Sequence, residues 1–148
     1  MSTYTHILYH VVFATKNRRR TLDKSRRDDL FRYIWGIVKN RDCHLYRIGG
    51  VEDHVHILTS LHPTVALADL IKDIKVASSK WIKEGNVFPE FESWQEGYAA
   101  LTHSLPEKDR LIEYIKGQEE HHRSVVFLDE YREMLRKAGM ELDERYLP

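Results

Sequence analysis

The 148-residue sequence has a single cysteine, four prolines, seven glycines and no net formal charge at pH 7. With Cys43 alone the chain can form neither an internal disulfide nor a cysteine-based zinc site, so any metal chemistry falls to histidine, carboxylate and amide groups. No apolar run approaches the roughly 20 residues of a membrane helix, and the first residues lack the basic segment and cleavage site of a signal peptide. We therefore expect one cytoplasmic domain over residues 1–148, without a membrane partner.

The zero net charge conceals a bipolar distribution. Residues 1–50 contain 11 lysines and arginines and four acidic residues, whereas residues 51–148 contain 12 and 19. The basic side chains of the first part gather over a short stretch: Lys16, Arg18, Arg19, Arg20, Lys24, Arg26 and Arg27. Such a cluster attracts a phosphate backbone, although an ordinary solvated surface gives the same pattern.

Four segments have the composition of β-strands. Residues 5–15 are rich in β-branched and aromatic side chains and apolar on both faces, which is typical of a central strand. Residues 43–51 and 54–60 are separated by a short turn and predict an antiparallel hairpin. Residues 92–103 predict a fourth strand, which Gly97 weakens.

Helical spacing of apolar residues separates these strands. It predicts one helix over residues 23–41 and a second that begins at Thr64. A capping box at residues 104–107 predicts a third helix that runs past Gln118. A last helix shows an apolar stripe at Leu128, Tyr131, Leu135 and Ala138. The β-α-β-β-α-β order matches the ferredoxin-like fold, an α+β fold whose antiparallel sheet has helices on one face, here followed by C-terminal helices.

His54 and His56 form a His-x-His pair in the second strand of the predicted hairpin. Alternate residues of a strand project to the same face, so both imidazoles share one side of the sheet while Val55 and Ile57 occupy the other. Two neutral imidazoles at this spacing can bind one metal ion, and a pair of hydrogen-bonded histidines is the alternative. Imidazole suits zinc or manganese better than magnesium, although phosphate oxygens of a substrate can complete a site for a hard cation.

Tyr114 and Gln118 stand four residues apart in the third predicted helix and therefore share one face. A tyrosine hydroxyl can attack phosphorus, and the resulting phosphotyrosine conserves the phosphodiester energy for a later joining step. The sequence has no glycine-rich nucleotide-binding loop, which agrees with a reaction that needs no nucleotide cofactor. A core tyrosine beside a solvent-facing glutamine is the alternative. Gly117 favours a helix that can bend, and His121 and His122 follow closely enough to approach a metal.

Other residues allow two interpretations. Lys72 and Lys75 lie opposite the apolar stripe of the second predicted helix, where they form either a second phosphate-contacting strip or a solvated face. Trp94 and Tyr98 either stack on unpaired bases or pack in the core.

Several ordered motifs make the sequence similar to a known family. They are residues 9–13 (YHVVF) followed by 16–20 (KNRRR), 53–58 (DHVHIL), 78–81 (SSKW), 94–98 (WQEGY), and 114–118 (YIKGQ) with 119–122 (EEHH). With these motifs the chain resembles the single-tyrosine HUH transposases, small insertion-sequence enzymes that act on single-stranded DNA. Their relatives include the REP-associated tyrosine transposases. The resemblance spans nearly the whole chain.

The resemblance implies a ferredoxin-like catalytic domain in which His54 and His56 bind the metal, Gln118 is the third metal ligand and Tyr114 is the nucleophile. It implies that the tyrosine attacks a phosphate of single-stranded DNA with Mg²⁺ or Mn²⁺, forming a 5′-phosphotyrosine and freeing a 3′-OH. It also implies DNA ends that form hairpins and a homodimer in which the tyrosine-bearing helix of one subunit can complete the metal site of the other, so Tyr114 serves either its own subunit's site or the partner's. The basic residues that it favours as backbone contacts are Lys16, Arg18, Arg19 and Arg20.

Two other functions fit part of the sequence. A domesticated hairpin-binding protein would keep the fold and the basic cluster without moving DNA, but the intact set of site residues argues against it. A metal-dependent hydrolase of small phosphoesters needs only the histidine pair and leaves the arginines and the tyrosine helix without a purpose. We therefore expect a transposase that cleaves and rejoins single-stranded DNA at the ends of an insertion element.

Overall fold

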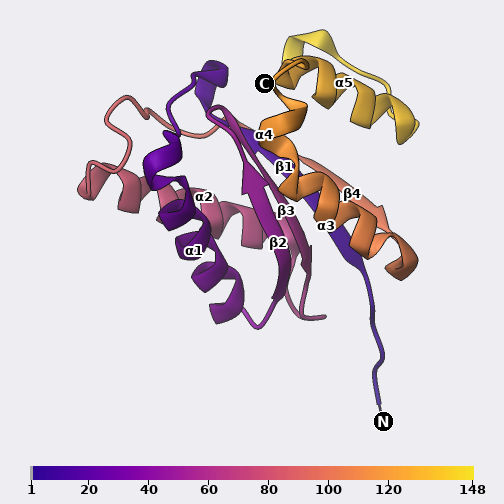
Figure 1. Ribbon diagram of the computed structural model, residues 1–148. Helices are drawn as coiled ribbons and strands as arrows, with labels where there is room; N and C mark the ends of the chain where they lie inside the picture. Colours follow the sequence, from indigo (N-terminus) through magenta and orange to yellow (C-terminus); the bar gives the residue numbers. More distant parts are fainter. Residues whose placement is uncertain (1) are drawn as a thin grey trace.

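A four-stranded antiparallel sheet is the centre of the computed structural model, which describes residues 2–148 (Figure 1). The strands lie in the order β2-β3-β1-β4, so β1 is central, as its apolar faces predict. The strand bounds are β1 Leu8–Ala14, β2 His44–Gly50, β3 His54–Ser60 and β4 Ala99–His103. This arrangement confirms the predicted α+β class with its antiparallel sheet.

Helices cover both faces of the sheet. α1 and α2 lie on one face, and α3, α4 and α5 lie on the other (Figure 1). The helix bounds are α1 Lys24–Asn40, α2 Leu67–Glu84, α3 Lys108–Lys116, α4 Gln118–His121 and α5 Phe127–Lys137. Single turns of 3-10 helix are η1 Lys16–Arg18, η2 Leu105–Glu107 and η3 Glu144–Tyr146. Within residues 2–148, no helix combines the length and the apolar character needed to cross a membrane.

The alternation of β3 decides which side chains face which helical layer. Val55 and Ile57 are fully buried in the main apolar core beneath α1 and α2. His54 and His56 lie on the opposite face, and Leu58 continues that face by packing against α3. Both histidines are completely buried. The prediction that the two imidazoles share one side of the sheet is therefore confirmed.

Several predicted elements are longer than the observed ones, among them the first strand, predicted over residues 5–15 and observed as β1. The predicted strand 92–103 narrows to β4, because Gly97 adopts a φ of 82° and turns the chain before the strand starts. Trp94 contributes only an isolated bridge to Thr15. The second helix begins at Leu67 rather than at Thr64, whose hydroxyl instead lies 2.7 Å from the His62 ring.

The third predicted helix does not run through Gln118 without interruption. α3 ends at Lys116 and α4 starts at Gln118, with Gly117 between them. The sequence anticipates the bend, since glycine weakens a helix interior, but not that it divides the helix. The tyrosine and the glutamine therefore lie on separate but adjoining helices.

Gly49 of β2 allows α3 to approach the sheet. A Cβ added at this glycine would lie 2.7 Å from the backbone oxygen of Ile115 and 2.9 Å from its Cγ2. Because Ile115 directly follows Tyr114 in sequence, this close contact sets how deeply the tyrosine-bearing helix sits against the sheet.

We expect Gly49→Ala to lower the free energy of unfolding by about 1–3 kcal/mol, because the added methyl group forces α3 outward. Gly36→Ala in α1 is the matched control, since a Cβ there meets no atom within 4 Å. That change should stabilise by about 0.5–1 kcal/mol through helix propensity. Chemical denaturation of both variants measures the difference, and equal effects would contradict the close approach.

A candidate metal centre beside a tyrosine

The ring nitrogens of His54 and His56 converge on one carboxylate. β3, which carries both histidines, lies between β1 and β2 in the sheet. Both histidines are 0% exposed. His56 Nε2 lies 3.1 Å from Glu130 Oε1, and His54 Nε2 lies 3.3 Å from the same oxygen. Glu130 comes from α5 and is 4% exposed. The two predicted histidines therefore belong to a buried cluster that includes an acid from the C-terminal layer.

His122, at the end of α4, completes this cluster. Its Nε2 lies 3.1 Å from Glu130 Oε1, while its Nδ1 lies 2.6 Å from the backbone oxygen of Val125. One ligand atom from each of His54, His56, His122 and Glu130 lies within 4.8 Å of all the others. Three imidazole nitrogens and a carboxylate oxygen are a donor set that binds divalent cations, so these residues fit a metal ion.

Gln118 places its side-chain oxygen at the same point. Gln118 Oε1 lies 3.1 Å from His54 Nε2 and 3.0 Å from His122 Nε2. Its Nε2 donates a hydrogen bond of 3.1 Å to Glu130 Oε2. The side chain is buried, with 1% of the residue exposed. The glutamine is therefore part of the site and does not face solvent.

Tyr114 reaches the cluster through its hydroxyl, which donates a hydrogen bond to Glu130 Oε2. Its ring meets the ring of His56 edge-on, with 5.7 Å between centroids. Glu130 thus stands between the tyrosine on one side and the imidazoles on the other. The structure brings together all four residues that the sequence predicts for the reaction: His54, His56, Tyr114 and Gln118.

The buried charges of the site alter each other's ionisation. Burial acts to raise the pKa of Glu130, but hydrogen bonds from His122, His54 and His56 outweigh it and hold that pKa well below its usual range. Burial, together with the charge and hydrogen bond of Glu130, raises the pKa of Tyr114, so its hydroxyl keeps its proton. Burial lowers the pKa of His56 to about 4. Burial also acts to lower the pKa of His54, but hydrogen bonds to two carboxylates outweigh it and raise that pKa.

Each strand histidine has a partner behind its ring. His54 Nδ1 lies 2.7 Å from Asp53 Oδ1, and His56 Nδ1 lies 2.8 Å from Nε2 of His10 in β1. Partners of this kind fix the orientation and tautomer of metal-binding histidines. Burial, helped by the charges of His56 and His103, lowers the pKa of His10 to about 3. His10 is therefore neutral. Its Nε2–H can donate to His56 Nδ1 while His56 Nε2–H donates to Glu130, and with a metal ion at His56 Nε2 the His10 ring would instead accept from the His56 Nδ1–H.

An ion pair anchors α4 to the other helical layer. Arg27 of α1 is 3% exposed, and its guanidinium donates to Glu119 Oε1 at 3.1 Å and to the backbone oxygen of Leu22 at 3.0 Å. Glu119 directly follows Gln118 in sequence. A one-turn helix has little stability of its own, so this tertiary contact holds the glutamine in the site.

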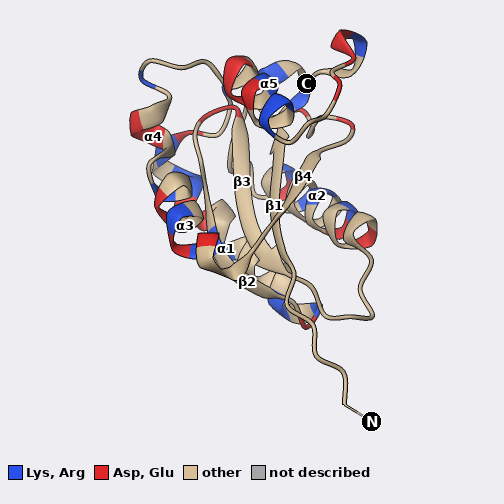
Figure 2. Cartoon of the chain, turned by 90° about the vertical axis from the view of Figure 1, so that its right-hand side faces the viewer, with Lys and Arg blue, Asp and Glu red and all other residues tan. Residues whose placement is uncertain are grey.

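The predicted DNA-contacting residues are more dispersed than the site residues. Figure 2 shows Lys and Arg interspersed with Asp and Glu along α2, α3 and α5. Near η1, Lys16 lies 3.0 Å from Glu92, Arg19 lies 3.7 Å from the same acid, and Arg20 lies 3.4 Å from Glu52. Each of these ion pairs is exposed and stabilises the protein only slightly. The lysine or arginine can therefore leave its acidic partner and bind a phosphate instead.

The remaining predicted contacts differ from one another. Arg18 is partly exposed in η1, and Lys72 is exposed on α2. Lys75 is partly buried, and its ammonium donates to the backbone oxygens of Gln95 and Gly97. Burial lowers the pKa of Lys75 to about 8. Its contacts hold the 95–97 loop onto α2, which is a structural task.

Sequence reasoning did not identify Glu130 or the role of His10. The predicted apolar stripe of the last helix begins at Leu128, whereas the buried face of α5 includes Phe127, Glu130 and Tyr131. If the stripe starts at Phe127, one residue earlier, helical spacing includes Glu130 on the buried face. A buried acid is rare, and this was the sequence signal for a role of Glu130. His10 gave no signal beyond its place on a central strand.

Comparison with known proteins places the chain in a family. The family model described as "Transposase IS200 like" matches residues 3–118. The chain belongs to this family of transposases. The matched part includes His54, His56, Tyr114 and Gln118, whereas His122 and Glu130 lie beyond it.

Individual relatives agree with this assignment. The ISDra2 transposase TnpA of Deinococcus radiodurans is 26% identical over 117 residues, which cover 74% of this chain and 82% of the relative. A crystal structure of a candidate transposase from Deinococcus radiodurans R1 is 25% identical, with a TM-score of 0.62, covering 80% of this chain and 95% of that one. The structure of a REP-associated tyrosine transposase bound to a REP hairpin shares the fold at 16% identity, with a TM-score of 0.60. It covers 84% of this chain and 76% of that one.

We expect His10→Leu to weaken Mn²⁺ binding by about 10- to 100-fold, because His56 loses the acceptor that orients its ring. Titration calorimetry on the folded variant measures this change. His10→Gln restores an acceptor and should recover most of the affinity, whereas a purely structural role would give no such rescue. His62→Leu, at an exposed histidine, is the control. Unchanged Mn²⁺ affinity in His10→Leu would rule out the positioning role.

Proposed function

We propose that this protein is a metal-dependent transposase that cleaves and rejoins single-stranded DNA at the ends of an insertion element, with Tyr114 as nucleophile. The observation that carries the proposal is the meeting of the Tyr114 hydroxyl, the paired imidazoles of β3 and the Gln118 oxygen around one buried carboxylate. The family assignment supports DNA transposition as the setting.

The cleavage step is a transfer of the phosphoryl group to the tyrosine. Tyr114 Oη attacks the scissile phosphorus, the bond from phosphorus to the 3′ oxygen breaks, and the products are a 5′-phosphotyrosine and a free 3′-OH. Glu130 accepts the hydrogen bond of the hydroxyl and so orients it. The proton that the tyrosine loses is the one that the departing 3′ oxygen gains when it becomes the free 3′-OH. A 3′-OH from another strand reverses the step and rejoins the DNA, so no nucleotide cofactor is consumed.

His54, His56, His122 and Glu130 would hold the divalent cation, with Gln118 Oε1 beside them. A cation bound there would polarise the phosphate and oppose the rise in the pKa of Tyr114. Mg²⁺ and Mn²⁺ are the candidates. Three imidazoles suit Mn²⁺ better than Mg²⁺, which prefers oxygen ligands and retains its water.

We propose that Tyr114 serves the metal site of its own subunit within a homodimer. The tyrosine, the three imidazoles and Glu130 all come from one chain, and the Glu130 hydrogen bonds join them directly. A second subunit is not needed to complete the set of groups. The homodimer follows from the resemblance to the single-tyrosine HUH transposases.

The proposed substrate is single-stranded DNA with hairpin-forming ends. A relative of the same fold has been seen bound to a REP hairpin. We assign backbone contacts to the basic residues of η1 and α2, where exposed cations can replace a weak ion pair by a phosphate. The residues concerned are Lys16 and Arg18 of η1, Arg19 and Arg20 directly after it, and Lys72 of α2. Lys75 is left out, because its ammonium already donates to the backbone oxygens of Gln95 and Gly97.

We expect the protein to form a covalent adduct with labelled single-stranded DNA from the ends of its own locus when Mn²⁺ is present. Tyr114→Phe keeps the ring but removes the hydroxyl, so it should bind the DNA and form no adduct. Denaturing gel electrophoresis separates the adduct from free DNA and locates the cleaved bond. Mn²⁺ should give more adduct than Mg²⁺, and chelation should abolish it.

Two results would contradict the transferase. An adduct that persists in Tyr114→Phe would assign the nucleophile to another residue. Tight hairpin binding by the wild-type protein without any adduct would favour the alternative function, a domesticated hairpin-binding protein whose site no longer cleaves.

A mixing experiment tests which subunit supplies the tyrosine. One population carries His54→Ala and His56→Ala, and the other carries Tyr114→Phe. After subunit exchange, we expect the mixed dimers to remain inactive, because each chain lacks part of its own site. Recovery of adduct to a quarter or more of the wild-type level would show that the tyrosine acts on the partner's metal site.

A further inference from the structure

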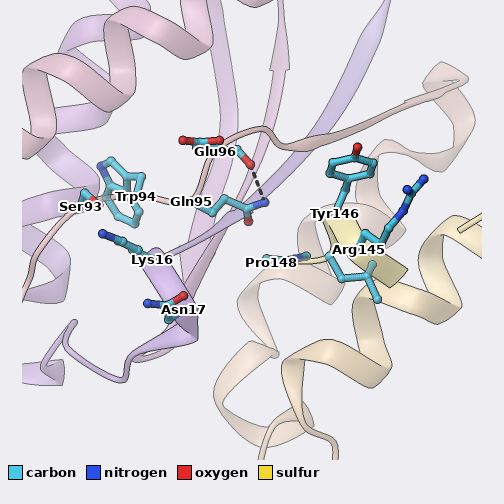
Figure 3. Close-up of a pocket in the computed structure, with 10 residues that line it drawn as sticks. Lys16, Asn17, Ser93, Trp94, Gln95, Glu96, Arg145, Tyr146 and Pro148 are labelled. Carbon is cyan, nitrogen blue, oxygen red and sulfur yellow. Dashed lines mark hydrogen bonds between the residues drawn. The ribbon is translucent and has the colours of Figure 1, made fainter. Parts of the chain in front are cut away.

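A cavity of about 410 Å³ lies at the end of β1, outside the metal cluster. Figure 3 shows its lining from three segments: Lys16 and Asn17 of η1, residues 93–96, and residues 145–148 around η3. The residues from η3 lie beyond the part of the chain that the family model matches. The cavity is therefore formed partly by a segment outside the residues that the family model matches.

The cavity is close to the metal cluster along two neighbouring strands. Ala14 of β1 pairs directly with His54 of β3, and Lys16 follows Ala14 by two residues. Two residues of chain span at most about 7 Å. The side chain of Gln95, which lines the cavity, accepts a hydrogen bond from the Ala14 backbone N–H. A DNA strand whose phosphate lies at the metal cluster can therefore place a neighbouring nucleotide at the cavity.

The inner wall of the cavity is rigid. Trp94 is 7% exposed, its Nε1 donates to Ser78 Oγ at 2.9 Å, and its ring packs edge-on against Phe13 with 5.1 Å between centroids. Gln95 is 8% exposed and bonded at both ends of its amide, to Ala14 and to the backbone oxygen of Glu96. Trp94 thus packs in the core, which is one of its two predicted roles. Only a small part of its surface lines the cavity.

The outer wall offers the groups that an unpaired nucleotide needs. Tyr146 is 76% exposed, so its ring is accessible to a base. The Arg145 guanidinium lies 5.3 Å from that ring, over its face. Lys16 and Arg145 each form an exposed ion pair, with Glu92 at 3.0 Å and with Asp143 at 2.7 Å, which a phosphate can replace.

We propose that this cavity receives one unpaired nucleotide of the DNA strand that neighbours the scissile phosphate. Its base stacks on Tyr146, and its phosphate lies against Lys16. Exposed aromatic rings beside cations are the common means of holding single-stranded nucleic acid. The proposal rests on the proposed function, because it takes from there both the single-stranded DNA substrate and the position of the scissile phosphate at the metal cluster.

The test is a scan with 2-aminopurine, a fluorescent base that stacking quenches, placed singly at each unpaired position beside the hairpin. The protein is the full chain with Tyr114→Phe, so that the DNA stays intact. One position should be quenched on binding, and the added change Tyr146→Ala should remove that quenching and weaken binding by about 5- to 100-fold. Tyr146→Phe keeps the ring and should behave like the parent. Tyr4→Ala, at another exposed tyrosine, is the matched control.

The outcomes separate the cavity from the transferase. If the wild-type protein forms the tyrosine adduct but no position depends on Tyr146, the cavity assignment is wrong and the transferase stands. If one position depends on Tyr146 but no adduct forms, the cavity binds a nucleotide and the transferase fails. Absence of any DNA binding overturns both.

Discussion

The buried carboxylate of Glu130 is the interaction on which the rest of the site depends. An acid that is 4% exposed is costly to bury unless its charge is compensated. Here three imidazoles, a glutamine amide and a tyrosine hydroxyl surround it, and together they supply the compensation. Two of the imidazoles come from β3, the hydroxyl comes from α3, and the third imidazole and the amide come from the α4 segment, so the carboxylate of α5 gathers four elements at one point.

This dependence explains the division of the chain into two helical layers. α1 and α2 form the main apolar core with one face of the sheet, and this core is the largest apolar cluster of the described residues. The other half has only small apolar clusters, around Leu8 with α3 and around Val12 with α5. The polar cluster lies between these two, and it supplies the contacts that the small clusters lack. In this layer, the residues of the candidate metal site therefore also stabilise the fold.

Local patterns in the sequence predict the parts of the site that depend on local structure. The face shared by His54 and His56 follows from strand alternation, and the proximity of Tyr114 to Gln118 follows from helical spacing. Local spacing marks Glu130 only as an acid on the buried stripe of α5, whereas its role arises from the packing of α5 against a strand more than 70 residues earlier. The low helix propensity of Gly117 predicts a bend in the helix at this position. The break itself was not predicted, because tertiary contacts decide whether the helix divides.

The alternation of β3 has a consequence for how the protein reaches its native state. A slip of β3 by one residue against β1 would turn both imidazoles into the apolar core and bring Val55 and Ile57 to the polar cluster. Glu130 would then lose two of the three imidazoles that compensate its charge, and the cation would lose two of its four ligands. Binding of the cation therefore stabilises the correctly aligned molecule most, and a cell rich in the right ion would favour correct folding as well as activity.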